Sequence, residues 1–203
     1  MATENQDQIN ELKSILEELR KQLLDASIHF EIWQDLWPTT EVVDVINRYK
    51  GFFLPTRNAH IDRFYIKICN VMSSRSSQPS FYRIFNILNK NTALAPGIDI
   101  RSLKKRLNSH KKTVDAIKEY RNKKVAHWDM RIQTQRKPVL LGNCKRMLVE
   151  LQDIFNEISS ATSKNIWSFK YVQHGDTNIL LSHLNELRAI HKQQIDTLIN
   201  RQF

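Results

Sequence analysis

Apolar residues recur in alternating three- and four-residue steps through the first 37 positions of the chain. This spacing keeps them on one side of an α-helix, as in the seam of a coiled coil. The seam residues are Ile9, Leu12, Leu16, Leu19, Leu23, Ala26, Phe30, Trp33 and Trp37. Pro38 ends the predicted helix, because proline cannot continue the helical hydrogen-bond pattern. The pattern leaves open whether the seam packs within one chain or between two.

The middle of the chain predicts three shorter helices. Thr39 or Thr40 can cap the first, which is expected to end at Gly51 because glycine is favoured just past a helix C-terminus. A second helix is expected from about Arg57 to Met72, and a third passes through the apolar positions between residues 81 and 88. The polar segment SSRSSQPS between these two helices is typical of a linker.

A long basic helix follows. Asp99 can cap its N-terminus, and its apolar stripe extends to about His127. Residues 128–142 lack clear periodicity and predict a loop, after which Asn143 begins another helix.

Asp176 or Thr177 can cap the last predicted helix. The sequence shows neither an internal repeat nor a convincing strand pattern, so the predicted fold class is all-α. We expect a single domain over residues 1–203, in which residues 1–37 form the long N-terminal helix. Residues 99–163 would supply the basic helix, the loop and the helix after it.

Composition limits the classes of protein that this chain can represent. It contains 41% hydrophobic and 26% charged residues, which is typical of a globular protein, and no apolar stretch approaches the length of a membrane span. The polar start MATENQDQINEL resembles neither a secretory signal nor a transit peptide. Cys69 and Cys144 are too few for a disulfide framework and fit a reducing compartment. We therefore expect a cytoplasmic protein.

Most of the net charge of +10 lies in one segment of the sequence. Between Arg101 and Lys124 there are ten Lys and Arg residues against only Asp115 and Glu119, a net charge of +8. A polyanion would be attracted to this strip, with an affinity that falls as salt rises. The alternative is a solvated helix face with no ligand.

Near the end of the basic helix, residues 121–127 read RNKKVAH. Arg121 is permanently cationic and suited to holding phosphate, and His127 can exchange a proton near neutral pH. On one ideal helix these residues are separated by about 9 Å of rise and about 120° of rotation. Both could reach one phosphate only if the helix frays after Lys124 or a second copy of it lies across a two-fold axis. The geometry therefore favours a homodimer with a composite cleft.

The stretch EYRNKKVAHWD resembles the signature of the HEPN superfamily: an arginine, a polar residue, and a histidine after four to six intervening residues. Asn122 is the polar residue here, and five residues separate Arg121 from His127. The R-N-K-x-x-A-H-x-D form and the upstream pattern NAHIDRFYIKICNV are most similar to the HEPN-like family named for the AbiU abortive-infection proteins. This resemblance covers about Phe30 to Leu198. It implies an antiparallel helical bundle with a long N-terminal helix.

The resemblance also implies a function, because many HEPN proteins are metal-independent endoribonucleases of phage-defence or toxin–antitoxin systems. His127 would then be the general acid or base, Arg121 would hold the scissile phosphate, and Asn122 would orient the pair. The expected partners are RNA, a second copy of the chain and an antitoxin protein, with neither a metal nor a cofactor. The residues expected to contact RNA phosphates are Lys104, Lys105, Lys111, Lys112, Lys118, Lys123 and Lys124.

Other interpretations of the motif stay open. Some HEPN toxins carry a tyrosine two residues after the histidine, where a nucleotidyltransferase silences them, but this chain has Asp129 there. Asp129 could support His127, end the helix, or form an internal ion pair with Arg121, and His127 could be an idle residue near a helix C-terminus. HEPN proteins also include non-catalytic modules that bind RNA or protein, which is the alternative function.

No other constellation in the sequence matches a known type of site. The histidines lack metal-ligand spacing, and four isolated glycines do not form a phosphate-binding loop. Arg57 and His60 echo the main motif, but their spacing is too short, so we expect them to be structural.

Overall fold

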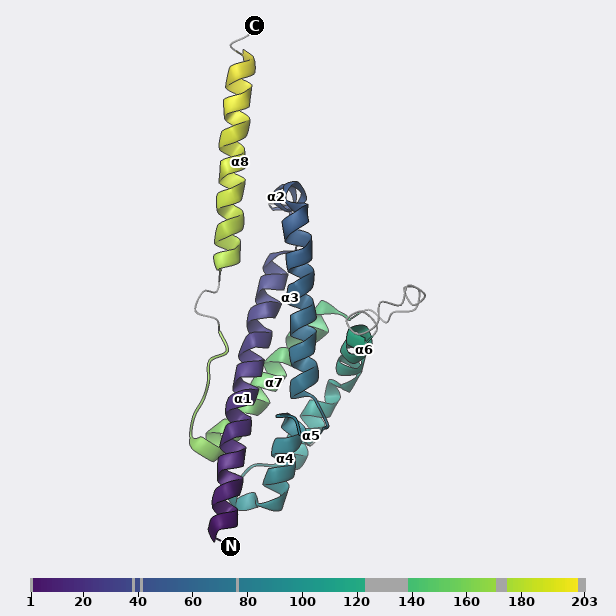
Figure 1. The fold of residues 1–203 in the computed structure, drawn as a ribbon, viewed down its shortest axis with the longest axis vertical. Coiled ribbons are helices and arrows are strands. Elements are labelled where there is room, and N and C mark those ends of the chain that lie inside the picture. The colour runs from purple at the N-terminus through teal and green to yellow at the C-terminus, as the bar shows by residue number, and fades with distance from the viewer. Residues whose placement is uncertain are drawn as a thin grey trace. The chain divides into compact units, whose positions relative to one another are not determined.

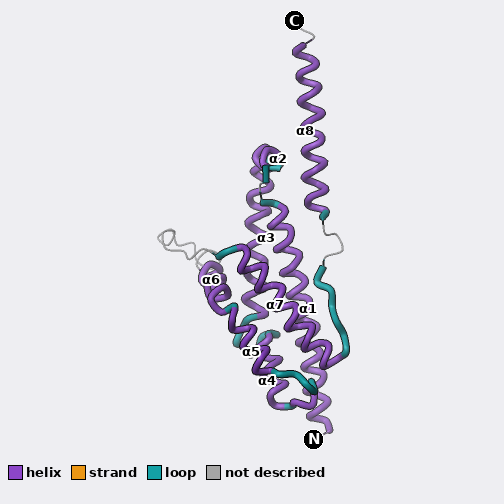
Figure 2. The backbone as a smooth tube through the Cα atoms, turned by 180° about the vertical axis from the view of Figure 1, so that it is seen from behind, coloured by secondary structure: helices purple, strands orange, loops and turns teal. Residues whose placement is uncertain are grey.

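The computed structural model describes residues 2–37, 39–40, 42–75, 77–122, 139–170 and 175–200. It divides into two compact units, the first made of Met1–Ser27 with Asp62–Lys170 and the second of Ile28–Ile61 with Tyr171–Phe203. Every regular element in these ranges is a helix (Figure 1, Figure 2). The all-α prediction is confirmed. None of the helices described is long and apolar enough to cross a membrane.

The first helix, α1 (Ala2–Asp35), buries the predicted seam within the chain. In the first unit Leu12, Leu19 and Leu23 are at most 3% exposed. These side chains face the apolar sides of other helices of the same unit, so this part of the seam is a core rather than a surface awaiting a second chain. Trp37, at the end of the pattern, is 52% exposed and does not continue the buried face.

The predicted break before α3 is wrong. Helix α2 (Val43–Arg48) is short, and α3 (Lys50–Val71) begins at once and includes both Gly51 and Pro55. Pro55 is tolerated because it lies near the N-terminus of the helix. Proline has no N–H, so the helix loses only one hydrogen bond, to a carbonyl of the first turn. No side chain of the described residues caps α2, so the predicted threonine cap is not formed there. Thr39 instead accepts hydrogen bonds through its backbone carbonyl.

Helix α4 (Phe81–Lys90) follows the linker and is capped by Ser80, whose hydroxyl accepts a hydrogen bond from the Arg83 N–H. It buries Phe81, Ile84 and Phe85 completely, which matches the predicted apolar positions. The short 3-10 helix η1 (Thr92–Leu94) comes next.

The long basic helix is in fact two helices, α5 (Ile100–Ser109) and α6 (Lys111–Arg121). Asp99 caps α5 as predicted, because its carboxylate accepts hydrogen bonds from the next backbone N–H groups. The break falls at His110, directly after Ser109, whose side chain competes with helical hydrogen bonding. Ser109 donates its hydroxyl proton to the Arg106 carbonyl, at 2.7 Å between the oxygens. A prediction of one helix from apolar spacing alone missed this competition.

Helices α5 and α6 both pack against α7 (Leu141–Ser163) in the first unit (Figure 1, Figure 2). Arg106 fastens α5 to α7, since its guanidinium lies 2.6 Å from carboxylate oxygens of both Glu150 and Glu157. In the core, the side chains of Met147, Leu151 and Ile154 are fully buried. Helix α7 therefore forms the surface on which the basic helices are held.

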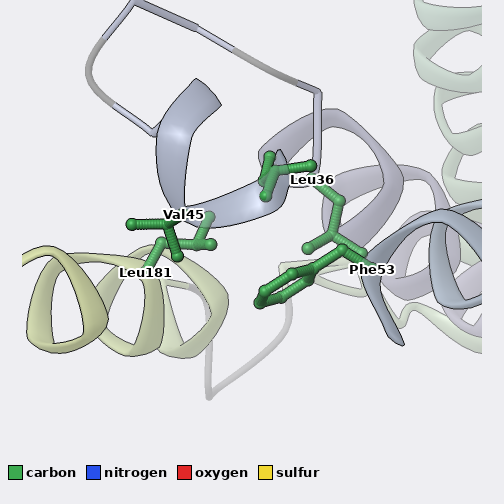
Figure 3. Close-up of a cluster of buried hydrophobic side chains, with 5 residues drawn as sticks. Leu36, Val45, Phe53 and Leu181 are labelled. Atoms are coloured by element: carbon green, nitrogen blue, oxygen red, sulfur yellow. The ribbon is translucent and has the colours of Figure 1, made fainter. Parts of the chain in front are cut away.

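The second unit has a small core of its own, in which Leu36, Val45, Phe53 and Leu181 converge with Ile46 (Figure 3). Leu181 is contributed by α8 (Asp176–Asn200), in which Asp176 is the first helical residue rather than the predicted cap. An ion pair between Arg188 and Asp44, 2.6 Å long, also joins α8 to α2. Further along α8 the apolar side chains are about half exposed: Leu187, Ile190, Ile195, Leu198 and Ile199.

Candidate functional site

The C-terminal end of α6 carries the first two residues of the predicted motif. Val114 and Ile117 are buried on one face of α6, and Arg121, one turn further on, is half-buried. Its Nε and Nη2 atoms both donate hydrogen bonds to Asn122 Oδ1, at 3.2 and 2.8 Å. Two bonds to one oxygen fix the plane of the guanidinium group. Asn122 is thus bonded to Arg121, while its predicted role of orienting Arg121 together with His127 stays a prediction.

Two uncharged side chains of α3, Cys69 and Tyr65, lie near the C-terminal end of α6. Burial raises the pKa of the Cys69 thiol, and the charges of Arg121 and Lys118 partly oppose that rise. Tyr65 lies close by against Tyr120, with ring centroids 5.0 Å apart. Burial, chiefly, raises the pKa of Tyr65 far above its usual range. Both side chains on α3 thus stay neutral.

Arg121 has no carboxylate partner within the described ranges, and its only hydrogen-bond acceptor there is the neutral amide of Asn122. A half-buried guanidinium in such a setting keeps its full positive charge available to a ligand. This arrangement suits the binding of an anion such as a phosphate. The predicted residues His127, Asp129, Lys123 and Lys124 lie outside the described residues. The convergence of Arg121 and His127 therefore stays a prediction.

The structure distinguishes among the predicted RNA-binding lysines of α5 and α6. Lys105 and Lys112 are exposed and bear no ion pair in the ranges described, whereas Lys111 lies 2.6 Å from the Asp115 carboxylate. Lys104 and Lys118 are half-buried, and Lys104 Nζ lies 5.9 Å from the centroid of the Phe85 ring. Among the predicted lysines of α5 and α6, Lys105 and Lys112 are thus the two that are exposed and bear no ion pair in the described ranges.

A pair of histidines in the second unit was not predicted, because the two residues are 31 positions apart. His29 Nδ1 on α1 lies 2.7 Å from His60 Nδ1 on α3. One of these atoms must carry the proton that is shared with the other, so the pair cannot hold two positive charges without breaking its bond. Burial also lowers the pKa of His60. His60, which belongs to the segment that resembles the main motif, thus makes a contact between α1 and α3.

This pair predicts a loss of stability in mild acid. The unfolded chain takes up a proton on His60 near the ordinary pKa of 6.5, while the folded chain does so at lower pH. The free energy of unfolding should therefore have its full value above pH 6.5 and decrease as the pH falls below 6.5. Urea unfolding at pH 7.5 and 5.5 measures the difference. His110, whose pKa is also lowered mainly by burial, adds to the same trend.

The variant His60→Gln should reduce this pH-dependent loss, because glutamine can still hydrogen-bond to His29 but does not titrate. His183→Gln is the matched control, since His183 is exposed on α8. If the free energy of unfolding fell by the same amount between pH 7.5 and pH 5.5 in the parent and in His60→Gln, the pH dependence could not be assigned to His60.

Comparison with known protein families adds one finding to this geometry. A family model of HEPN proteins, described as AbiU2, matches residues 9–181. This range begins within α1, includes α2 to α7 and the motif, and ends near the start of α8. No curated protein and no solved structure matches the chain.

Proposed function

The chain belongs to the AbiU2 family of HEPN proteins, and from this premise we propose that it is an endoribonuclease that cuts RNA without a metal ion. The observation that carries the proposal is the guanidinium of Arg121, held by Asn122 and left without a carboxylate partner in the described ranges. Structural arginines in helical bundles are normally paired, as Arg106 is with Glu150 and Glu157. Arg121 differs from them in keeping its charge available.

The proposed reaction is a transfer of the phosphate ester within the RNA strand. His127 removes the proton of a ribose 2′-hydroxyl, and the resulting oxygen attacks the adjacent phosphorus. Arg121 stabilises the negative charge that develops on the phosphate oxygens. The bond to the 5′-oxygen of the next nucleotide then breaks, and that oxygen takes a proton from an imidazolium. The products are a 2′,3′-cyclic phosphate and a free 5′-hydroxyl.

Two imidazoles in opposite protonation states serve this reaction better than one. A homodimer that brings two copies of the motif to one cleft would supply both, one as the base and one as the acid. The half-exposed apolar side chains on the second half of α8 support association of the chain with a partner, because contiguous apolar surface usually marks an interface.

The setting that fits this activity is phage defence by abortive infection, or a toxin–antitoxin system. Cutting cellular RNA would stop growth of an infected cell, and such an enzyme would need to be restrained by an antitoxin protein until infection. Lys105 and Lys112 would draw RNA to the site through phosphate contacts that do not depend on base sequence.

The direct test incubates the purified protein with a single-stranded RNA in the presence of EDTA. We expect cleavage to proceed, and to weaken as salt rises because the lysine contacts are screened. RNA that is retained in a salt-dependent way but never cut would instead support the alternative, a non-catalytic RNA-binding module. The double variant Lys105→Gln/Lys112→Gln should raise the RNA concentration needed for half-maximal rate by about 3- to 30-fold. Lys13→Gln on α1 is the control, and it should leave this concentration unchanged.

A further inference from the structure

A cavity of about 550 Å³ opens in the first unit, away from Arg121. It lies between α1, η1, the last turns of α7 and the segment 165–167. Its apolar lining includes Leu12, Leu16, Leu94 and Phe155. Protein interiors rarely leave voids larger than a water molecule, and small-molecule sites have volumes of roughly 300–1,000 Å³. The cavity therefore has the size of a ligand site rather than of a packing defect.

One wall of the cavity is Trp167, which lies outside any helix but is held by three hydrogen bonds. Its backbone N–H donates to Asn156 Oδ1 at 2.8 Å, and its carbonyl accepts from Asn156 Nδ2 at 3.0 Å. Its indole Nε1–H donates to the buried hydroxyl of Ser159 at 3.2 Å. Although it is fixed in this way, the side chain is still 37% exposed. Trp167 thus presents a preformed aromatic surface whose own polar atom needs no further partner.

A second wall carries positive charge. The guanidinium carbon of Arg20 lies 4.6 Å from the centroid of the Trp167 ring. Its Nε and Nη2 atoms donate hydrogen bonds of 2.8 and 2.7 Å to the Glu17 carboxylate. This pairing locks Arg20 in place and neutralises it.

Lys13, one turn before Glu17 on α1, also lines the cavity, and it has no ion-pair partner within the described ranges. With Arg20 and Glu17 cancelling each other, the titratable side chains of the lining leave one uncompensated positive charge. That charge lies at the end of the long, mobile side chain of a lysine, which can adjust to an anionic group.

We propose that this cavity binds a small aromatic anion, a flat ring system bearing one carboxylate, sulfonate or phosphate group. The ring contacts Trp167 and the apolar lining, and the acidic group pairs with Lys13. A neutral aromatic molecule would leave Lys13 unused, and a purely aliphatic anion would forgo the contact with the indole. This site is separate from Arg121 and Asn122, since neither of these two described motif residues lines the cavity.

The test uses 2-naphthoate as the probe and the indole N–H signals of the protein in a nitrogen–proton NMR spectrum. The chain has four tryptophans, and the signal of Trp167 is identified by its loss in Trp167→Phe. Titration of the parent with 2-naphthoate should shift this signal saturably, with a Kd on the order of 0.1–1 mM for a ligand of this size. The signal of Trp37 is the internal control. The guanidinium carbon of Arg57 lies 5.0 Å from the centroid of the Trp37 ring, but Trp37 does not line the cavity.

Two comparisons test the chemical class of the ligand. The neutral analogue 2-naphthylmethanol should bind at least 5-fold more weakly than 2-naphthoate, and Lys13→Gln should weaken 2-naphthoate to a similar extent. Lys105→Gln, on α5, should leave the affinity unchanged. A parent protein whose Trp167 signal does not respond saturably to the naphthoate would overturn the proposal. Equal binding of the two compounds, with no effect of Lys13→Gln, would overturn the recognition of an anion.

Discussion

Arg121→Ala and His127→Ala should each lower the rate of RNA cleavage by about 10²- to 10⁴-fold. In the proposed reaction, Arg121 would supply the positive charge that stabilises the developing charge on the phosphate, and His127 would transfer the proton. Initial rates on a single-stranded RNA at saturating concentration measure the effect. Arg101→Ala is the matched control, because Arg101 is an exposed arginine at the start of α5, outside the motif. Its rate at saturation should equal that of the parent.

Both variants should remain folded. The Arg121 side chain is bonded only to Asn122 in the described ranges, so its removal leaves no buried charge without a partner. Melting curves followed by circular dichroism check this point. If Arg121→Ala and His127→Ala were folded and cut RNA as fast as the parent, the assignment of the site would be wrong.

Leu181→Ala should lower the free energy of unfolding of the second unit by about 2–5 kcal/mol. Leu181 is 1% exposed and is the one side chain of α8 that the described part of the helix buries completely. Its truncation leaves a cavity against Val45 and Phe53 and removes the main apolar contact between α8 and α2 (Figure 3). Urea unfolding followed by circular dichroism provides the measurement.

Leu54→Ala is the control for this substitution. Leu54 lies on α3 in the same unit and is 39% exposed, so its truncation should cost much less. Losses of equal size in the two variants would show that α8 is not held through Leu181.

The parts of the fold that could be predicted from the sequence are those set by local periodicity. The α1 seam, the apolar face of α4 and the Asp99 cap follow from residues within a few positions of each other. The continuation of α3 through Pro55 depends on the position of that proline near the start of the helix. The break at His110 follows the competition of the Ser109 hydroxyl for a helical carbonyl. Apolar spacing carries no information about that competition.

The candidate site was predictable to the extent that its residues are neighbours in the sequence. The bond between Arg121 and Asn122 joins adjacent positions, so a motif can reveal it. The pair His29–His60 and the contact of Arg20 with Trp167 join residues far apart along the chain. Only the packing of several helices creates such contacts, and no local pattern marks them beforehand.

We propose that this chain cuts RNA through attack by the 2′-hydroxyl. Mass spectrometry of the products tests it most directly, with an RNA oligonucleotide cut in EDTA and a matched oligonucleotide that carries a 2′-deoxynucleotide at the cleavage position. The account predicts a 2′,3′-cyclic phosphate and a 5′-hydroxyl from the first and no cut at that position in the second. Cleavage beside the deoxynucleotide, or products that carry a 5′-phosphate, would contradict it.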